Sequence, residues 1–396
     1  MDLGWKLSNF HIRTYKSKEG VAMRKGLPGS ISFILLISAL VLIPPLVCAQ
    51  PAPATAPTLS ALAQVIEGAK KEGTVSTKLA VTVRETTVQR LKNEIKAKYG
   101  VDLKINNTPL TVMPQAIGNL LMELKAGATP SIDLMTINQN EIVPYVQGGA
   151  GQKVDWKPLA AEAGVPVKAI MGVPPELELF YGYGLLYFSS HLGLMYNPKI
   201  IPPGEVPKKL SDLANPKWKG LLGMRGLSSW FRRYAYFVGQ DYILDSLRAI
   251  MKNGVVLDSQ GNLANRFKLG EIAMAYMVSE WLTDARRSGP AEWQSMEVSH
   301  VDHFYNGIVT GAAHPNAAKL VTLYLASPDG YKLMSETTGA GNMLYPGNTE
   351  YEIDQQDRAK GLRFDGSLTD EKLWKFMTSK EIQDLSKKID MIFKGG

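Results

Sequence analysis

The chain has 396 residues, of which 45% are apolar and 20% are charged. This composition is ordinary for a soluble globular protein and excludes a disordered, collagen-like or coiled-coil chain, and the length favours two lobes over one core. The formal charge of +7 is concentrated in the first 49 residues, and the remaining residues carry only +3. Because the basic residues are scattered and form no stripe with aromatic residues, nucleic acid is not an expected partner.

The N-terminus predicts export. A short basic stretch at Met23-Arg24-Lys25 precedes the apolar run 31–43, and Val47-Cys48-Ala49 supplies small side chains after it. This is the pattern of a secretory signal cut after Ala49, with translation starting at Met23. The apolar run is too short to span a bilayer comfortably, so an uncleaved anchor is the less favoured alternative. We expect residues 1–49 to be leader and signal peptide and residues 50–58 to be a Pro/Ala spacer, which places the protein in the periplasm or outside the cell.

Cys48 is the only cysteine in the chain. A lipoprotein would carry its acyl chains on this residue, but Pro45-Leu46-Val47 is a poor match to the approach that lipidation requires. Cleavage after Ala49 leaves no cysteine. Disulfides and thiolate chemistry are then excluded, although an exported protein could form disulfides.

Helical and strand patterns alternate through the first part of the exported chain. Helical spacing of apolar residues is followed by Gly at several helix ends, and short β-branched runs lie between the helices. The predicted order is helix 59–71, strand 74–83, helix 86–99, strand 101–105, helix 114–126 and strand 132–137. This alternation predicts parallel βαβ units and an α/β lobe.

The pattern changes in the second half. Residues 185–197 hold two apolar pieces around Ser189-Ser190-His191, and several prolines follow. The predicted elements beyond them are strand 221–224, a helix with its start at Ser228-Ser229 and its body at 230–238, strand 307–309 and helix 315–325.

Four blocks resemble a known family in their order along the chain. They are 124–136 (LKAGATPSIDLMT), 196–224 (YNPKIIPPGEVPKKLSDLANPKWKGLLGM), 268–276 (KLGEIAMAY) and 307–334 (GIVTGAAHPNAAKLVTLYLASPDGYKLM). They resemble periplasmic solute-binding proteins of ABC transporters, family 1, in the ferric-ion-binding group. The resemblance implies two Rossmann-like α/β lobes joined by crossing strands (the type II architecture), a ligand between them, and closure by a hinge. It also implies a permease in the inner membrane as partner.

The same resemblance divides the chain into lobes. We expect lobe 1 to contain residues 59–190 and 304–340. Lobe 2 should contain residues 191–303 and 341–396, the last part as C-terminal helices. We expect a monomer.

Ferric-binding members of this group hold iron with a His, a Glu and adjacent Tyr residues. The positions that match these ligands are Arg84, Asn138, Glu280 and Trp281. Ferric iron is a hard cation that needs anionic oxygen donors, and an arginine would repel it. The tyrosine pair is missing, so bare ferric iron is not the expected ligand, and we predict no resident metal or cofactor.

An organic anion suits these residues better. The planar fork of Arg84 can hold a carboxylate or phosphonate, although it could equally be a solvated arginine at the start of a helix. Ser228 and Ser229 lie where the family grips an anion at a helix start, with simple N-capping as the alternative. Asn138 and Ser190 are expected to orient the solute.

Each remaining candidate could have a purely structural role instead of a role in ligand binding. Glu280 could pair with an amine or hydroxyl of the ligand, or lie on the surface at the end of its strand. Trp281 and Tyr276 could stack on an organic ligand, although aromatic residues at strand ends are more often core. His191 is more often a structural histidine than a ligand contact.

No catalytic constellation is visible. The stretch His300-Val301-Asp302-His303 has no helical context for a metal pair, and phosphate-loop, dinucleotide and Gly-x-Ser-x-Gly motifs are missing. We therefore predict the solute-binding component of an ABC importer rather than an enzyme. The alternatives are a binder of an iron complex, cationic vitamin or polyamine through Glu280 and the aromatic residues, an enzyme on the same fold, and a sensory module.

Overall fold

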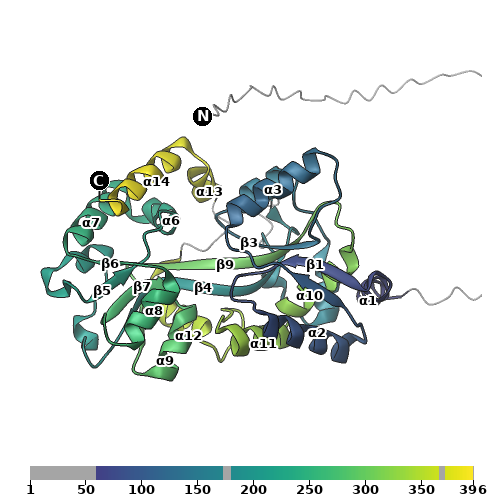
Figure 1. The fold of residues 1–396 in the computed structure, drawn as a ribbon, viewed down its shortest axis with the longest axis horizontal. Coiled ribbons are helices and arrows are strands. Elements are labelled where there is room, and N and C mark those ends of the chain that lie inside the picture. Colours follow the sequence, from purple (N-terminus) through teal and green to yellow (C-terminus); the bar gives the residue numbers. More distant parts are fainter. Residues whose placement is uncertain (1–58, 173–179, 365–370, 396) are drawn as a thin grey trace, which may run out of the picture. The chain divides into compact units, whose positions relative to one another are not determined.

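The computed structural model describes residues 59–172, 180–364 and 371–395 (Figure 1). The predicted signal peptide, its cleavage site, the spacer and Cys48 lie outside these described residues. Within the described ranges, no helix combines the length and the apolar content needed to cross a membrane.

The described helices and strands alternate for most of the chain. The helices are α1 (Ala61–Glu72), α2 (Glu85–Tyr99), α3 (Met113–Lys125), α4 (Ile142–Gln147), α5 (Trp156–Ala163), α6 (Ser229–Val238), α7 (Gln240–Lys252), α8 (Gln260–Lys268), α9 (Glu280–Ser288), α10 (Pro315–Ala326), α11 (Pro328–Thr338), α12 (Thr349–Ala359), α13 (Glu371–Met377) and α14 (Lys380–Phe393). The strands are β1 (Thr74–Lys78), β2 (Lys104–Asn107), β3 (Leu134–Asn138), β4 (Leu185–Tyr196), β5 (Leu222–Met224), β6 (Val256–Leu257), β7 (Met274–Val278), β8 (Glu292–Gln294), β9 (Val298–Ile308) and β10 (Arg363–Phe364).

Local sequence signals explain the predicted helices. Helix α1 begins where the Ser60 side chain accepts a hydrogen bond from the Ala63 N–H at 3.2 Å. It ends at Gly73, whose φ of 63° is the left-handed conformation that glycine adopts without strain. The predicted helices in this region and in the second half correspond to α1, α2, α3, α6 and α10, so these predictions are confirmed.

The sheet is mixed, with the strand order β2-β1-β3-β9-β4-β7-β5-β6. Strand β1 pairs in parallel with β2 and β3, and β5 pairs in parallel with β6 and β7. Strand β9 runs antiparallel to β3 and β4, and β4 runs antiparallel to β7. The α/β prediction is confirmed, and the two long antiparallel strands join its two parallel parts.

The two apolar pieces within 185–197 form a single strand. Strand β4 is continuous, and every one of its residues is buried. The polar residues in its middle do not interrupt it because they have partners inside the protein. The Ser189 hydroxyl, for example, accepts a hydrogen bond from the Met343 N–H at 3.1 Å.

Two hydrophobic cores lie at the two ends of β4 and β9. The first core contains Leu185 to Phe188 of β4 and Tyr305 and Ile308 of β9. The second core contains Leu192, Leu194 and Tyr196 of β4 and Val298 of β9. Strands β4 and β9 therefore cross from one lobe to the other, and Figure 1 shows them running through the centre of the molecule. We call them the crossing strands.

The C-terminal helices pack against both cores. On α14, Ile382, Leu385 and Ile389 belong to the second core. On α13, Trp374 packs against the first core while Phe376 packs against the second. Helix α13 thus touches both lobes.

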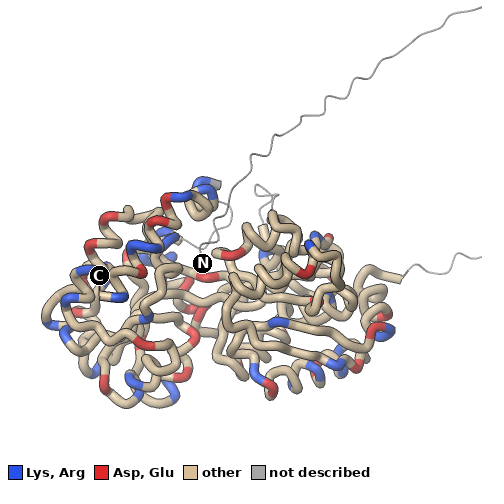
Figure 2. The backbone as a smooth tube through the Cα atoms, turned by 45° about the horizontal axis from the view of Figure 1, so that its top comes forward, with Lys and Arg blue, Asp and Glu red and all other residues tan. Residues whose placement is uncertain are grey.

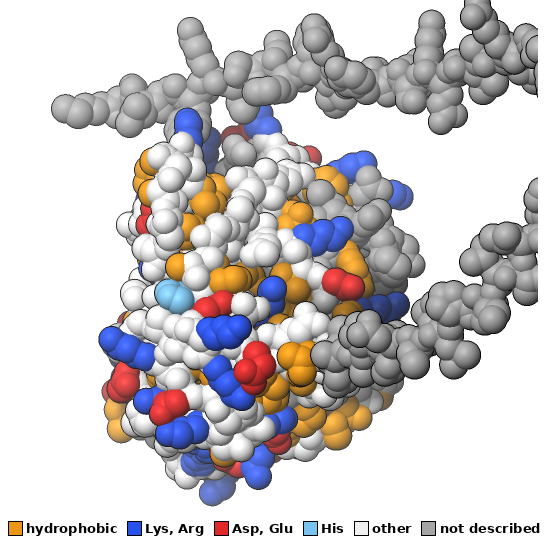
Figure 3. Space-filling model, turned by 90° about the vertical axis from the view of Figure 1, so that its right-hand side faces the viewer, with side chains coloured by type: hydrophobic (Ala, Val, Ile, Leu, Met, Phe, Trp, Pro, Cys, Tyr) orange, Lys and Arg blue, Asp and Glu red, His pale blue; other side chains and the backbone are white. Residues whose placement is uncertain are grey.

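Charged residues are distributed unevenly over the described chain. Figure 2 shows acidic residues close to the crossing strands, in the middle of the molecule. On the outer face of lobe 1, Lys and Arg side chains are interspersed with Asp and Glu (Figure 3).

Candidate functional site

A cavity of about 220 Å³ lies between the start of α2 and the start of α9. Arg84, the residue that precedes α2, lies on its lobe 1 side, where the end of α11 also contributes. Glu280 and Trp281, the first two residues of α9, lie on its lobe 2 side. Three of the nine predicted site residues therefore line one cavity, because β1 and β7 both end at it.

Two acidic residues of this cavity are already neutralised by basic neighbours. The carboxylate of Asp284 lies 2.8 Å from Lys268 Nζ. The carboxylate of Glu336 lies 2.7 Å from an Arg90 guanidinium nitrogen. Within the described residues, by contrast, Arg84 and Arg287 of the same cavity make no ion pair. The cavity thus has two uncompensated guanidinium groups.

Glu280 is the third acidic residue of the cavity. Burial raises its pKa to about 7, with further upward contributions from the negative charges of Glu350 and Asp302. At neutral pH its carboxyl is therefore protonated in a large fraction of molecules, and in that form it can donate a hydrogen bond.

Ser190 and His191 lie in a separate buried network on crossing strand β4. His191 is fully buried, and its Nδ1 lies 2.6 Å from Oε2 of Glu350. The Ser190 hydroxyl lies 3.4 Å from that of Ser279, at the end of β7. The protein itself holds the His191 ring, as the structural interpretation of this histidine expects.

Tyr276 lies inside the core of lobe 2. It is fully buried on β7 and stacks on Phe231 with the ring centroids 5.9 Å apart. Trp230 meets it edge-on at 6.3 Å. This is the core position that aromatic residues at strand ends commonly occupy.

Asn138, Ser228 and Ser229 lie at the ends of elements. Asn138 is the last residue of β3, and its side-chain oxygen accepts a hydrogen bond from the Asn140 N–H at 3.1 Å. Ser228 precedes α6, as predicted, but its side chain makes no capping hydrogen bond to that helix. Simple N-capping by Ser228 is therefore not what the structure has.

A buried polar cluster between α6 and β9 was not identified from the sequence. The Arg233 guanidinium lies 2.5 Å from Oδ1 of Asp302, 2.7 Å from Nε2 of His300, and also donates to the Gln139 side chain. The only sequence signal was the polar stretch His300-Val301-Asp302-His303, which lies inside β9.

No group of three or more His, Cys, Asp or Glu side chains suited to a metal ion occurs among the described residues. His300 contacts Arg233, and His303 contacts Gln139 and Met343 instead.

Two α/β lobes, crossing strands between them and a polar cavity at strand ends define a periplasmic-binding-protein fold. The chain belongs to the bacterial extracellular solute-binding protein family, whose model matches residues 91–354. Membership of this family makes it a solute-binding protein. A comparison with curated protein sequences gives no match.

Solved structures agree with this fold. A Trichodesmium protein in complex with iron and citrate is 16% identical, with a TM-score of 0.58 over 81% of this chain and 99% of that one. A putative spermidine/putrescine ABC transporter protein from Listeria monocytogenes is 14% identical, with a TM-score of 0.57 over 81% and 99%. The substrate-binding protein of an ABC transporter from Agrobacterium tumefaciens is 14% identical, with a TM-score of 0.60 over 82% and 96%. At these identities the likeness concerns the fold alone.

Proposed function

We propose that the protein captures a small organic anion, a carboxylate or phosphonate, between its lobes and delivers it to an ABC permease. The observation that carries this proposal is the pair of uncompensated guanidinium groups, Arg84 and Arg287, in one cavity. A guanidinium without an acidic partner is ready to form charge-assisted hydrogen bonds with a carboxylate or phosphonate. The acidic residues beside them do not cancel this preference, because Asp284 and Glu336 are paired elsewhere.

Glu280 supports the same ligand class. With its pKa raised to about 7, its carboxyl can donate a hydrogen bond to an anionic oxygen at neutral pH rather than repel it. Trp281 adds a flat apolar surface for the carbon skeleton of the solute. We assign orientation of the solute to Asn138, and additional anion contact to Ser228 and Ser229. Ser190 is given no contact with the solute, because it is 1% exposed and its hydroxyl faces that of Ser279.

A cationic ligand is the competing proposal, and Glu280 favours it. Once ionised, its carboxylate beside Trp281 would suit an amine, as in a polyamine or cationic vitamin, or an iron complex. Two neighbouring guanidinium groups would oppose such a ligand. We give the protein no catalytic role, a monomeric state and export through the predicted signal peptide, with lobes divided as 59–190 with 304–340 and 191–303 with 341–396.

The test is a thermal-shift screen of the purified protein against carboxylates, phosphonates, amines and ferric salts. A ligand in large excess over its dissociation constant stabilises the folded state by about 3–4 kcal/mol. We expect organic anions to raise the melting temperature. A shift with amines or ferric salts alone would overturn the anion proposal and favour the cationic one.

Arg84→Ala locates the site. Removing this guanidinium should weaken binding of the anion by about 1.5–3 kcal/mol, because a charge-assisted hydrogen bond is lost. The measurement is isothermal titration calorimetry, with Arg248→Ala on α7 as the matched control, since Arg248 is exposed and paired with Asp245. Unchanged affinity in Arg84→Ala would remove Arg84 from the site.

A further inference from the structure

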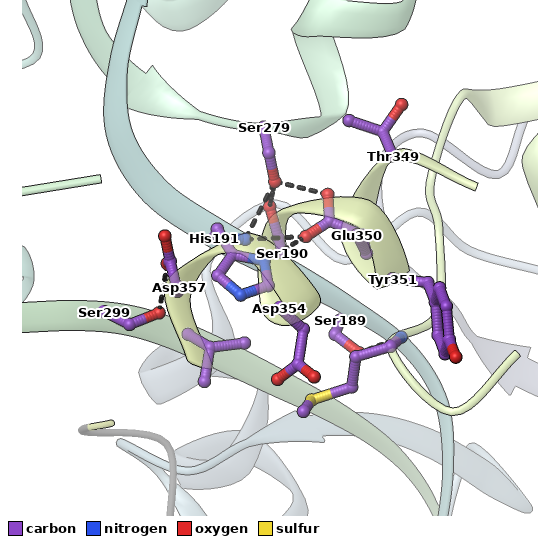
Figure 4. Close-up of polar contacts among 12 residues, drawn as sticks. Ser189, Ser190, His191, Ser279, Ser299, Thr349, Glu350, Tyr351, Asp354 and Asp357 are labelled. Atoms are coloured by element: carbon purple, nitrogen blue, oxygen red, sulfur yellow. Dashed lines mark hydrogen bonds and ion pairs between the residues drawn. The ribbon is translucent and has the colours of Figure 1, made fainter. Parts of the chain in front are cut away.

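Glu350 is a buried carboxylate held by neutral donors and a histidine. It lies in the first turn of α12 with 1% of its surface exposed. Its Oε2 accepts hydrogen bonds from the His191 main-chain N–H at 3.0 Å and from His191 Nδ1 at 2.6 Å. Its Oε1 accepts a short hydrogen bond from the Ser279 hydroxyl. Figure 4 shows the three residues converging from α12, β4 and the end of β7.

Burying a carboxylate is costly unless hydrogen bonds replace its water. The three donors to Glu350 meet this requirement. The carboxylate of Glu350 in turn fixes the positions of His191 and Ser279, which supply these donors. The Ser279 hydroxyl is held twice, because it donates to Glu350 and accepts from the His191 N–H at 2.8 Å. The main chain of Ser279 is held as well, since its N–H donates to the His191 carbonyl oxygen at 2.8 Å.

Ser279 immediately precedes Glu280, the carboxyl that lines the interlobe cavity. Because both its side chain and its main chain are held, Ser279 fixes the position and orientation of Glu280, the residue that follows it. Glu350 therefore influences the cavity indirectly, through its hydrogen bond to Ser279, the residue before α9.

The network also lies where β4 changes lobes. Phe188 belongs to the core of lobe 1 and Leu192 to the core of lobe 2, and Ser190 and His191 lie between them. A hinge rotation of the lobes must be absorbed in such a segment. The contacts of His191 therefore join the hinge to the position of Glu280.

Space around the network is tight at Gly341. A Cβ added to Gly341 would lie 2.7 Å from Cγ of Glu350, closer than side chains approach. The loop before α12 is itself fixed, because the Asn342 N–H donates to the Asn348 side chain at 3.1 Å. The segment that leads into α12 and Glu350 is therefore held by its own hydrogen bonds.

We propose that Glu350 is a positioning residue of the solute site, which holds Glu280 in place through Ser279 and ties that place to the crossing strand at His191. The inference rests on the proposed function for the identity of the ligand. The inference goes beyond the proposed function because it assigns a role to Glu350, a residue that contacts neither the cavity nor the solute.

The first experiment is a double-mutant cycle between Glu350→Gln and Ser279→Ala, with affinity for the best carboxylate of the screen measured by calorimetry. Each single variant should lose about ten-fold in affinity, and the double variant should lose no more, because both break the same connection. Multiplied losses of about a hundred-fold would mean two independent effects and would overturn the proposal. Ser279→Ala keeps the charge of α12, so it tests the connection even where Glu350→Gln folds poorly.

The matched control is Asp354→Asn. Asp354 lies one turn further along the same buried face of α12, is 3% exposed, and pairs with Arg358 rather than with Ser279 or His191. This variant removes the same charge from the same face. We expect its affinity to equal that of the unmodified protein. An equal loss in both carboxylate variants would reduce Glu350 to a structural role and overturn the proposal.

A second readout needs no ligand. Hydrogen exchange of the Ser279 amide should be about ten-fold faster in Glu350→Gln and unchanged in Asp354→Asn. If the unmodified protein binds no anion, the proposed function fails, and this measurement still decides the inference. Exchange at Ser279 that is the same in both variants would overturn it whatever the ligand.

Discussion

The side chains of Arg84, Arg287 and Glu280 line the cavity. Neighbouring residues determine which of them offers a charge to a ligand. Arg84 and Arg287 keep their charge available because the nearby carboxylates pair with Lys268 and Arg90. Glu280 keeps its proton because burial disfavours its charged form, and the charges of Glu350 and Asp302 act in the same direction. Residue type alone would count three acidic residues here and predict a cation site.

The raised pKa of Glu280 makes stability depend on pH. Its pKa is about 7 in the folded protein against an ordinary 4.5, so the folded state binds the proton more tightly. Stability is therefore lost as pH rises from about 4.5 through 7, where the fold must hold a charged Glu280. Glu280→Gln removes this cost and should stabilise the protein by about 3 kcal/mol more at pH 8 than at pH 4.5.

Urea unfolding of both proteins at the two pH values measures this difference. Asp245→Asn, on the exposed surface of α7, is the control and should show little difference between the two pH values. An effect of Glu280→Gln that is the same at pH 4.5 and pH 8 would contradict a raised pKa.

At the scale of elements, α12 is a helix whose buried face is acidic. Glu350, Ile353, Asp354 and Asp357 are buried at a spacing that puts them on one face. His191, Ser279, Ser299 and Arg358 supply their hydrogen bonds. A sequence such as TEYEIDQQDRA is typical of an exposed helix. Only the Asp354–Arg358 pair lies within it, and the other partners are more than 50 residues away.

This contrast explains which parts of the fold could be predicted. Helices α1 and α2 carry an apolar stripe and a terminal glycine, which are local signals, and they were predicted within two residues of their ends. The sequence does not show why β4 stays continuous, because its central Ser and His side chains are satisfied by distant residues. Arg84, Glu280 and Trp281 were selected because they match ligand positions of the ferric-ion-binding group, and the structure places these three at one cavity. Ser279 and Glu350 had no such signal.

The contact between α6 and β9 gives a prediction at the same scale. Arg233 on α6 is 2% exposed and neutralises Asp302 on β9, which is also buried. Arg233→Met leaves a buried carboxylate without its cation and should destabilise the protein by about 3–5 kcal/mol in urea unfolding. Arg248→Met, which breaks an exposed pair on α7, should change stability by less than about 1 kcal/mol. Replacing Asp302 with Leu in the Arg233→Met background should recover part of the loss, and a further loss would contradict this account.

At the scale of the whole described molecule, the lobes are connected in two different ways. The crossing strands β4 and β9 are continuous chain and can bend as a hinge. Helix α13 is a packing contact: Trp374 meets Phe180 of lobe 1 edge-on at 6.1 Å, and Phe376 meets Tyr236 of lobe 2 at 5.5 Å. A cavity of about 110 Å³ lies beneath it, lined on one side by α4 residues and on the other by α13. We expect the crossing strands to permit motion between the lobes and α13 to limit it.

Removing the lobe 1 contact of α13 should therefore open the protein. Trp374→Ala deletes the ring that meets Phe180 and leaves the lobe 2 contact of Phe376 in place. We expect a larger radius of gyration without ligand in small-angle X-ray scattering. We also expect an affinity about ten-fold weaker, because part of the binding free energy is then used to bring the lobes together. Trp218→Ala is the control: Trp218 belongs to the core of lobe 2 alone, so its loss should lower stability without changing the lobe separation. An unchanged radius of gyration in Trp374→Ala would mean that the crossing strands alone set the distance between the lobes. Helix α13 would then pack on lobe 2 without restricting lobe motion.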